Sequence, residues 1–92
     1  MEKIHTFESI QKECLDTYIK KNHDYGNSFD QSLDKFGVVA AIVRIEDKMN
    51  RISSLIQKEA KVNDESIEDT LLDLANYAIM TVKWKRNKTI NG

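Results

Sequence analysis

One apolar stripe constrains this chain more than any other feature of its sequence. Between about Gly37 and Gln57, apolar residues recur at steps of three and four: Val38, Ala41, Ile42, Ile45, Met49, Ile52 and Ile56. This spacing places them on one side of an α-helix, whereas a strand would need strict alternation. A helix of this kind has to bury its stripe and therefore needs other helices as partners. The sequence predicts an all-α fold.

Two further helices are predicted, one on each side of this segment. The first spans about Thr6–Lys21 with Thr6 as its N-cap, and the other spans about Ser66–Arg86 with an S-x-x-D capping box at its start. Their apolar residues also recur at helical spacing: Phe7, Ile10, Cys14, Leu15 and Tyr18 in the first, and Leu71, Leu74, Ala75, Ala78, Ile79 and Val82 in the other. The segments "NHDYGNSF" and "KEAKVNDE" are predicted to be a turn and a polar connection, with a short helical turn across Gln31–Phe36.

Length and composition set the size of the fold. The chain has 92 residues, no proline and three glycines, which suits a single helical domain over residues 1–92. A domain of this size buries only about two-thirds of its unfolded surface. Val43, Met80 and Trp84 lie off the main apolar stripes and would stay uncovered in three packed helices. We therefore expect a small bundle of three main helices that is completed by homo-oligomerisation.

Charge, cysteine content and hydropathy limit the expected partners and compartment. The net charge is −1, so no overall basic field favours DNA, and direct DNA binding is not expected. Cys14 is the single cysteine, which suits a reducing, cytoplasmic setting, and it is expected to be a small buried hydrophobe. The start "MEKIHTFESIQ" has no apolar signal-peptide core, and no stretch approaches ~18 apolar residues. A soluble protein without a membrane partner is expected.

Polar residues on the two longer predicted helices are also ordered into stripes. In "DTLLDLANYAI", Asp69 and Asp73 are four residues apart on one side of the helix, where like charges repel by a few tenths of a kcal/mol. Asn76 and Tyr77 continue this stripe. The preceding helix carries a stripe of mixed charge made of Arg44, Asp47, Lys48 and Arg51. Because the two aspartates do not help their own helix, we expect cations to lie opposite them.

Two interpretations of these stripes remain open. In the first, they form interhelical salt bridges between solvated faces, each worth only ~0–1 kcal/mol. In the second, they line a pocket in which Asp69 and Asp73 hold Mg²⁺ through carboxylate oxygens. The pocket would also use three kinds of ligand-binding side chain: Arg44, Lys48 and Arg51 on phosphate oxygens, Asn76 on polar edges, and Tyr77 or Tyr25 stacked on a base.

The loop "KKNHDYGNSF" contributes further candidates to the pocket. His23 and Asp24 are the only adjacent acid and base candidates in the chain, and Tyr25 and Phe29 flank the glycine of this loop. His23, Asp24 and Tyr25 are therefore expected to contact a ligand. A lone loop histidine is more often a solvated group than a catalyst, and Phe29 is expected to fill the core rather than stack on a base.

Three separated segments carry a family resemblance. "KNHDYGNSF", "AAIVRIEDKMNRISSLI" and "ESIEDTLLDLANYAIM", in that order, resemble the nucleotide-modification-associated domain of phages and bacteria, the first of that numbered group. The resemblance covers about Asn22–Trp84. It implies nucleotide handling in the cytoplasm of a bacterial host or a phage-infected cell, and it implies no particular reaction.

A more distant likeness is to the MazG-like all-α nucleotide pyrophosphohydrolases. Those helical oligomers bind Mg²⁺ through acidic residues on two helices and split a nucleoside triphosphate. Asp73, followed by "LANYA", is similar to the aspartate of their second acidic motif, and the resemblance adds Asp47 to Asp69 and Asp73 as a metal ligand. Their first motif, of the E-x-x-E type, is reduced here to Glu46, Asp47 and Asn50. Fewer carboxylates therefore remain than that mechanism uses.

Three functions follow from these patterns. The first is a protein that binds a nucleoside phosphate between helices and hydrolyses it with Mg²⁺ as a pyrophosphohydrolase. The second is a phage-type sponge that sequesters a nucleotide or a cyclic nucleotide signal without turnover. The third is a helical assembly module whose stripes are only subunit contacts.

Overall fold

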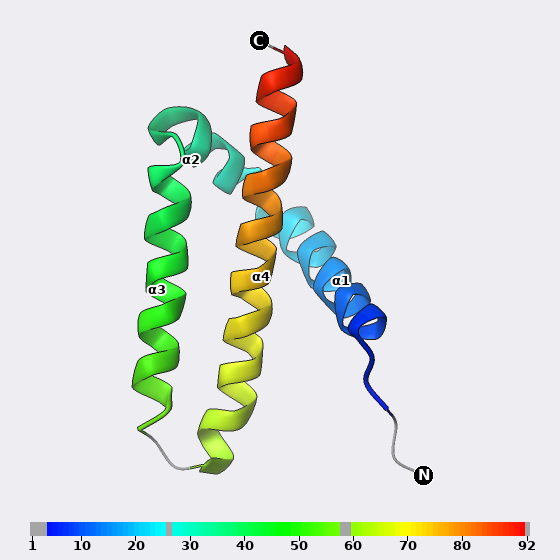
Figure 1. The fold of residues 1–92 in the computed structure, drawn as a ribbon, viewed down its shortest axis with the longest axis vertical. Coiled ribbons are helices and arrows are strands. Elements are labelled where there is room, and N and C mark those ends of the chain that lie inside the picture. Colours follow the sequence, from blue (N-terminus) through cyan, green and yellow to red (C-terminus); the bar gives the residue numbers. More distant parts are fainter. Residues whose placement is uncertain (1–3, 26, 58–59, 92) are drawn as a thin grey trace.

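The computed structural model describes residues 4–25, 27–57 and 60–91, and within these ranges the side chains of residues 24–25, 60–65 and 89–91 are not described. The described part folds into four α-helices: α1 (Phe7–Tyr25), α2 (Ser28–Phe36), α3 (Val39–Leu55) and α4 (Ala60–Asn91) (Figure 1). The predicted all-α fold is confirmed. No helix in the described ranges is long and apolar enough to cross a membrane.

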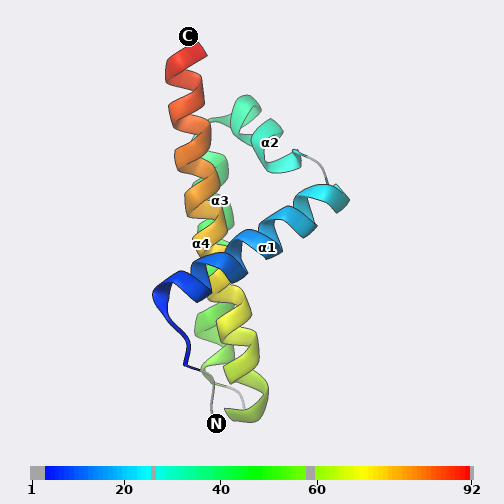
Figure 2. The same cartoon turned by 90° about the vertical axis from the view of Figure 1, so that its right-hand side faces the viewer.

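The long helix α4 organises the other three. α3 and α4 lie side by side and run in opposite directions, while α1 crosses α4 obliquely and α2 joins α1 to α3 (Figures 1 and 2). At 1.5 Å per residue, the 32 residues of α4 span about 48 Å, close to the longest dimension of the molecule, 49 Å. α4 contacts each of the other helices and is therefore the axis of the fold.

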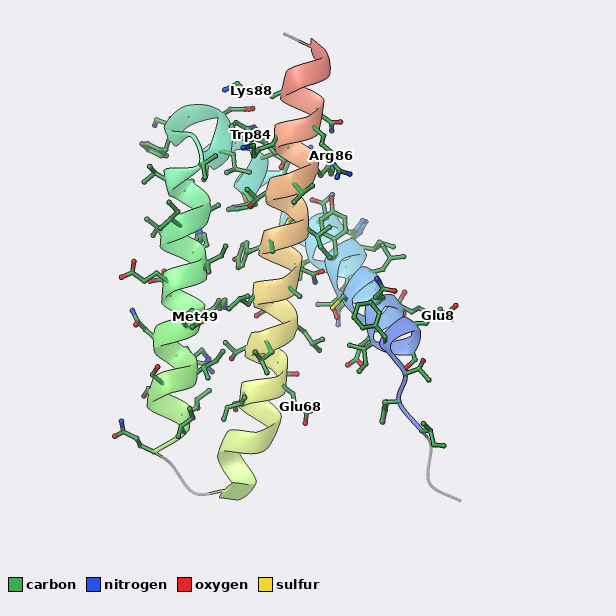
Figure 3. All side chains as sticks on the ribbon, viewed as in Figure 1. Glu8, Met49, Glu68, Trp84, Arg86 and Lys88 are labelled. Atoms are coloured by element: carbon green, nitrogen blue, oxygen red, sulfur yellow. The ribbon has the colours of Figure 1, made fainter. Side chains whose placement is uncertain are left out.

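The best-buried side chains lie where α2 meets α3 and α4. Phe29, Leu33 and Ala41 form this cluster, and Leu33 is fully buried. Trp84 packs against it from α4 and donates a hydrogen bond from Nε1 to Oδ1 of Asp34 in α2, at 2.8 Å (Figure 3). The predicted core position of Phe29 is confirmed. The cluster fixes α2 beside the upper half of α4.

Local sequence signals explain two helix boundaries. Thr6 is the N-cap of α1 as predicted, because the backbone N–H of Ser9 donates to its hydroxyl at 3.1 Å. The Ser9 hydroxyl accepts from the Thr6 N–H in return, at 2.9 Å. α2 ends at Gly37, whose φ of 74° is in the left-handed region that glycine enters without steric cost. The chain can therefore reverse sharply into α3.

Other predicted boundaries were wrong. α1 continues past Lys21 to Tyr25, and α2 is a nine-residue helix that starts at Ser28. Ser66 does not begin a helix, since α4 starts at Ala60, and the Thr70 hydroxyl donates to the Ser66 carbonyl at 2.7 Å inside it. Ala, Lys and Glu are good helix formers, so residues 60–65 of the predicted connection belong to α4 without an apolar period of their own, while residues 58–59 lie outside the described part.

Only part of the predicted apolar stripes is buried. Ala41 of the predicted stripe on α3 is buried, whereas Ile42, Met49 and the C-cap residue Ile56 of the same stripe are exposed. On α1, Cys14 is buried as predicted but Phe7 is exposed. The predicted stripes are therefore wider than the surfaces that the four helices of one chain cover.

Candidate functional site

A polar pocket lies where all four helices approach one another. It has a volume of about 250 Å³ and is lined by side chains of three kinds. These are the charged residues Lys21, Asp30, Arg44 and Asp73, the amides and hydroxyl Asn22, Asn27, Ser28 and Asn76, and the larger side chains Tyr18, Phe29, Tyr77 and Met80. Every helix contributes, so the fold positions the pocket as a unit.

Asp73 is the electrostatic centre of the pocket. Its Oδ1 accepts a hydrogen bond from Nζ of Lys21 in α1 at 2.6 Å, and its Oδ2 lies 3.3 Å from Nζ of Lys48 in α3. The Asp73 side chain is only 21% exposed. Its partner Lys48 is 27% exposed, so this pair is screened less than a surface pair, whereas Lys21 is 55% exposed. One carboxylate thus holds two ammonium groups from two other helices at the pocket wall.

Cations outnumber anions around this carboxylate. Arg44 of α3 lines the pocket together with Lys21, Asp30 and Asp73, and Lys48 pairs with Asp73 without lining the pocket itself. The group as a whole therefore has three cations and two carboxylates. The local excess of one positive charge contrasts with the net charge of −1 of the whole chain. A focused positive field of this kind attracts an anionic ligand.

Aromatic rings form the other wall. The rings of Phe29 and Tyr77 meet edge to face with centroids 5.0 Å apart and an interplanar angle of 65°. The hydroxyl of Tyr18 accepts a hydrogen bond from Nζ of Lys83 at 3.2 Å. This hydrogen bond is the main cause that raises the pKa of Lys83, so the lysine stays charged beside the ring. Tyr18 and Tyr77 therefore present partly apolar surfaces next to the cations.

Asn76 has a structural partner that the sequence did not reveal. It is buried, and its Nδ2 donates to the backbone carbonyl of Cys14 in α1 at 3.1 Å. This bond ties α1 to α4 at the edge of the pocket. The amide nitrogen of Asn76 therefore holds the two helices together, and the predicted contact of this side chain with a ligand stays a prediction.

The structure brings together only some of the predicted ligand-binding residues. Arg44, Asn76 and Tyr77 line the pocket. Lys48 does not line it but pairs with Asp73, which does, whereas Arg51 is exposed and does not line it. The remaining candidates come from the end of α1: His23, Asp24 and Tyr25. His23 is exposed and does not line the pocket, and the side chains of Asp24 and Tyr25 lie outside the described part of the structure.

The three predicted metal ligands are not brought together within one chain. Asp73 lies in the pocket, but Asp47 and Asp69 are exposed and do not line it. Among the described residues, no group of three or more His, Cys, Asp or Glu side chains could hold a metal ion. Both Asp73 oxygens also face lysines. This arrangement does not fit the expected carboxylate site for Mg²⁺.

Several pocket residues were missed from the sequence, above all Lys21 and Tyr18. A signal for Lys21 existed, because it continues the apolar stripe of α1 at a step of three after Tyr18. A lysine in line with core positions indicates a partner on the helix opposite. Asn27, Ser28 and Asp30 were also missed, because the start of α2 at Ser28 was not predicted and the candidates in this part of the chain were taken from His23–Tyr25 instead.

A second, apolar groove adjoins the pocket between α1 and α4. Its volume is about 510 Å³, and it shares Tyr18, Asn76 and Met80 with the pocket. The remaining lining is mostly aliphatic and aromatic: Phe7, Ile10, Gln11, Cys14, Leu15, Ala75, Ile79 and Lys83. The polar pocket therefore opens at one side onto an apolar surface.

A family model described as nucleotide modification associated domain 1 matches residues 21–84, which is most of the chain. The match includes all of α2 and α3, and it includes every residue that lines the polar pocket except Tyr18. No curated protein and no solved structure matches this chain.

Proposed function

Because the chain belongs to the nucleotide modification associated domain 1 family, we propose that its polar pocket binds a nucleoside phosphate. The observation that carries this proposal is that Lys21 and Lys48 pair with one carboxylate, Asp73, in a pocket that Arg44 and aromatic rings also line. Guanidinium and ammonium groups are the usual protein donors to phosphate oxygens. Tyrosine rings stack on bases without strong preference for one base.

The roles within the pocket follow from its two walls. Phosphate oxygens approach Lys21, Arg44 and Lys48, and the base lies against Tyr18 or Tyr77. Asn27 and Ser28, at the start of α2, offer an amide and a hydroxyl for hydrogen bonds to sugar or base. The volume of about 250 Å³ is near the lower end of the range for small-molecule sites, roughly 300–1,000 Å³. This size favours a mononucleotide over a cyclic dinucleotide.

Binding without turnover is the form of this proposal that the pocket favours. Magnesium-assisted hydrolysis needs carboxylates with free oxygens, and Asp73 directs both of its oxygens at lysines. A sponge needs only affinity, which cations and aromatic rings supply. We therefore put sequestration of a nucleotide ahead of hydrolysis by this chain alone.

Calorimetric titration with nucleoside mono-, di- and triphosphates and with cyclic dinucleotides tests the proposal. The matched pair of variants is Lys21→Ala and Lys20→Ala, because both lysines lie on α1 but only Lys21 lines the pocket. Lys21→Ala should weaken binding of a phosphorylated ligand roughly tenfold, the value of one charge-assisted hydrogen bond, and Lys20→Ala should leave it unchanged. Equal affinities for both variants, or no binding by the parent, would reject the pocket as the site.

Product analysis of the same mixtures separates the two forms of the proposal. A sponge returns the nucleotide intact after prolonged incubation with Mg²⁺. Release of pyrophosphate or phosphate in proportion to protein concentration would instead establish hydrolysis. If the Lys21→Ala variant released no product, the hydrolytic site would be this pocket.

A further inference from the structure

The chain exposes much more surface than a folded monomer of its mass. Its accessible surface is 7577 Å², whereas a monomer of 10.7 kDa is expected to expose about 5,500 Å². The radius of gyration is 15.1 Å, against about 12 Å for a single domain of 92 residues. An excess of roughly 2,000 Å² per chain is in the range that permanent homodimers bury.

Part of the exposed apolar surface forms two rows along α3 and α4. Ile42 and Met49 on α3 and Ile56 at its C-cap recur at steps of seven and are 55%, 53% and 64% exposed. On α4, Leu71 and Val82 are about half exposed. Ala78, which is also exposed, lies between them at steps of seven and four. Both rows run along their helices rather than being scattered.

Helical geometry places the two rows on the same face of the α3–α4 pair. At roughly 100° per residue, the Ile42 row lies about 75° round α3 from the residues that pack on α4. The Ala78 row lies about 120° round α4 from Tyr77, in the same sense. Because α3 and α4 are antiparallel, rotations in the same sense turn both rows toward the same face. Arg44 and Asn76 are rotated the other way, so the polar pocket is on the opposite face.

The arrangement of the helices agrees with this assignment. α2 and the C-terminal half of α1 lie on one side of the α3–α4 pair, the side of the pocket (Figure 2). Within the described ranges, no other helix crosses the front of α3 and α4 in Figure 1. The face that carries the two apolar rows, which we call the open face, is therefore left uncovered by the chain itself.

We propose that a second copy of this chain packs on the open face and that the two α3–α4 pairs form a four-helix bundle. The uncovered area is part of the fold and needs a permanent occupant, which a second copy supplies in every cell that makes the protein. The face carries equivalent rows from two antiparallel helices, so a twofold axis through it makes it self-complementary. With a net charge of −1 per chain, two copies do not repel strongly. Both polar pockets stay open on the outer sides of this dimer.

A matched pair of substitutions on α3 tests the face. Met49 and Val43 are almost equally exposed, at 53% and 52%, but Val43 points away from the open face by helical position. Light scattering of the parent at tens of micromolar should give about 21 kDa, two chains of 10.7 kDa. Met49→Glu should give a monomer or an unfolded chain, and Val43→Glu should keep the dimer mass and the helical circular dichroism. A parent that is monomeric, or a Met49→Glu variant that stays dimeric, overturns the proposal.

A second test keeps Met49 in place and therefore does not depend on whether the Met49→Glu variant folds. It measures the rate at which methionine side chains of the folded protein are oxidised. In the Val43→Met variant, hydrogen peroxide followed by peptide mass spectrometry compares the new methionine with Met49. Covered by a second copy, Met49 should oxidise at least severalfold more slowly than the new methionine. Equal oxidation rates at the two positions mean that the open face is not covered, and they also overturn the proposal.

Discussion

Lys21 and Asp73 are 52 positions apart in the sequence, yet Nζ of the lysine lies 2.6 Å from Oδ1 of the aspartate. Lys48 approaches the other oxygen of the same carboxylate at 3.3 Å. In the free protein, Asp73 therefore holds both ammonium groups at the wall of the pocket. A phosphate would compete with Asp73 for them. The carboxylate that resembles a catalytic aspartate thus acts here as the internal counter-ion of the cations.

Replacing Asp73 by Asn should strengthen nucleotide binding. The change removes the competing charge but keeps the size of the side chain, so the lysines lose their internal partner and favour phosphate. We expect the affinity for nucleotide to rise about fivefold, because phosphate no longer has to replace ion pairs with Asp73 that are worth roughly 1 kcal/mol. Calorimetric titration measures it, and Asp69→Asn is the matched control, because Asp69 lies one turn earlier on α4 and is exposed.

The same titration in EDTA examines the expected role of Mg²⁺. If Asp73 is a counter-ion, affinity is the same with Mg²⁺ and with EDTA in the parent and in both variants. If it is a metal ligand, Asp73→Asn lowers affinity and the parent loses binding in EDTA. The direction of the change therefore separates the two roles.

Arg44 and Arg51 should differ in their effect on binding. Both were predicted to contact phosphate, but Arg44 lines the pocket and Arg51 does not. Arg44→Ala should weaken nucleotide binding roughly tenfold to a hundredfold, the range for hydrogen bonds to charged groups. Arg51→Ala should bind like the parent. Similar losses in both variants would show that phosphate lies farther along α3 than the pocket.

Asn76 should act on stability rather than on affinity. Asn76→Ala removes the hydrogen bond from Nδ2 to the Cys14 carbonyl, which joins α4 to α1. The loss of one buried hydrogen bond should lower the free energy of unfolding by about 1–2 kcal/mol, which corresponds to a fall in Tm of roughly 5–10 °C. Thermal unfolding followed by circular dichroism measures it, with Asn50→Ala on the exposed side of α3 as control. If Asn76→Ala instead left the Tm unchanged and abolished nucleotide binding, the predicted contact of Asn76 with the ligand would be supported.

Helical periodicity predicted the class of fold because each long helix repeats its apolar residues at steps of three and four. It could not predict which part of each stripe is covered, because that depends on how α1 and α2 are placed around α4. Ile42 and Ala41 illustrate the difference, since one is exposed and the other is buried on the same predicted stripe. Coverage is a tertiary property that a single helix does not encode.

The candidate site was predictable only where its residues belonged to a polar stripe. Arg44, Lys48 and Asp73 were found because their spacing stands out on long helices. Lys21 was missed because only the apolar residues of α1 were used to predict its packing, and because Asp73, the partner of Lys21, lies on another helix. Asn76 was found, and it lines the pocket, but nothing in its spacing points to the hydrogen bond that it donates to the Cys14 carbonyl.

Cys14 should be a poorly reactive thiol whose contribution to stability fades at high pH. Burial, and then the negative charge of Glu13, raise the pKa of the Cys14 thiol above its ordinary value of 9.0. The thiolate is the nucleophile, so an aromatic disulfide reagent at pH 8 should react many times more slowly with the native protein than with the protein in urea. Equal rates in the two conditions would show that the thiol is accessible.

The sign of the pH effect follows from this raised pKa. The unfolded chain loses the thiol proton near pH 9 while the folded chain keeps it, so the stability that burial of the neutral thiol contributes is present below about pH 9 and is lost as pH rises further. Lysines and tyrosines titrate in the same range, so the comparison is between the parent and Cys14→Ala. The Tm of the parent should exceed that of the variant most at pH 7–8, and the difference should shrink by pH 10. A difference that stays constant or widens over this range would mean that Cys14 is not protected from ionisation in the folded protein.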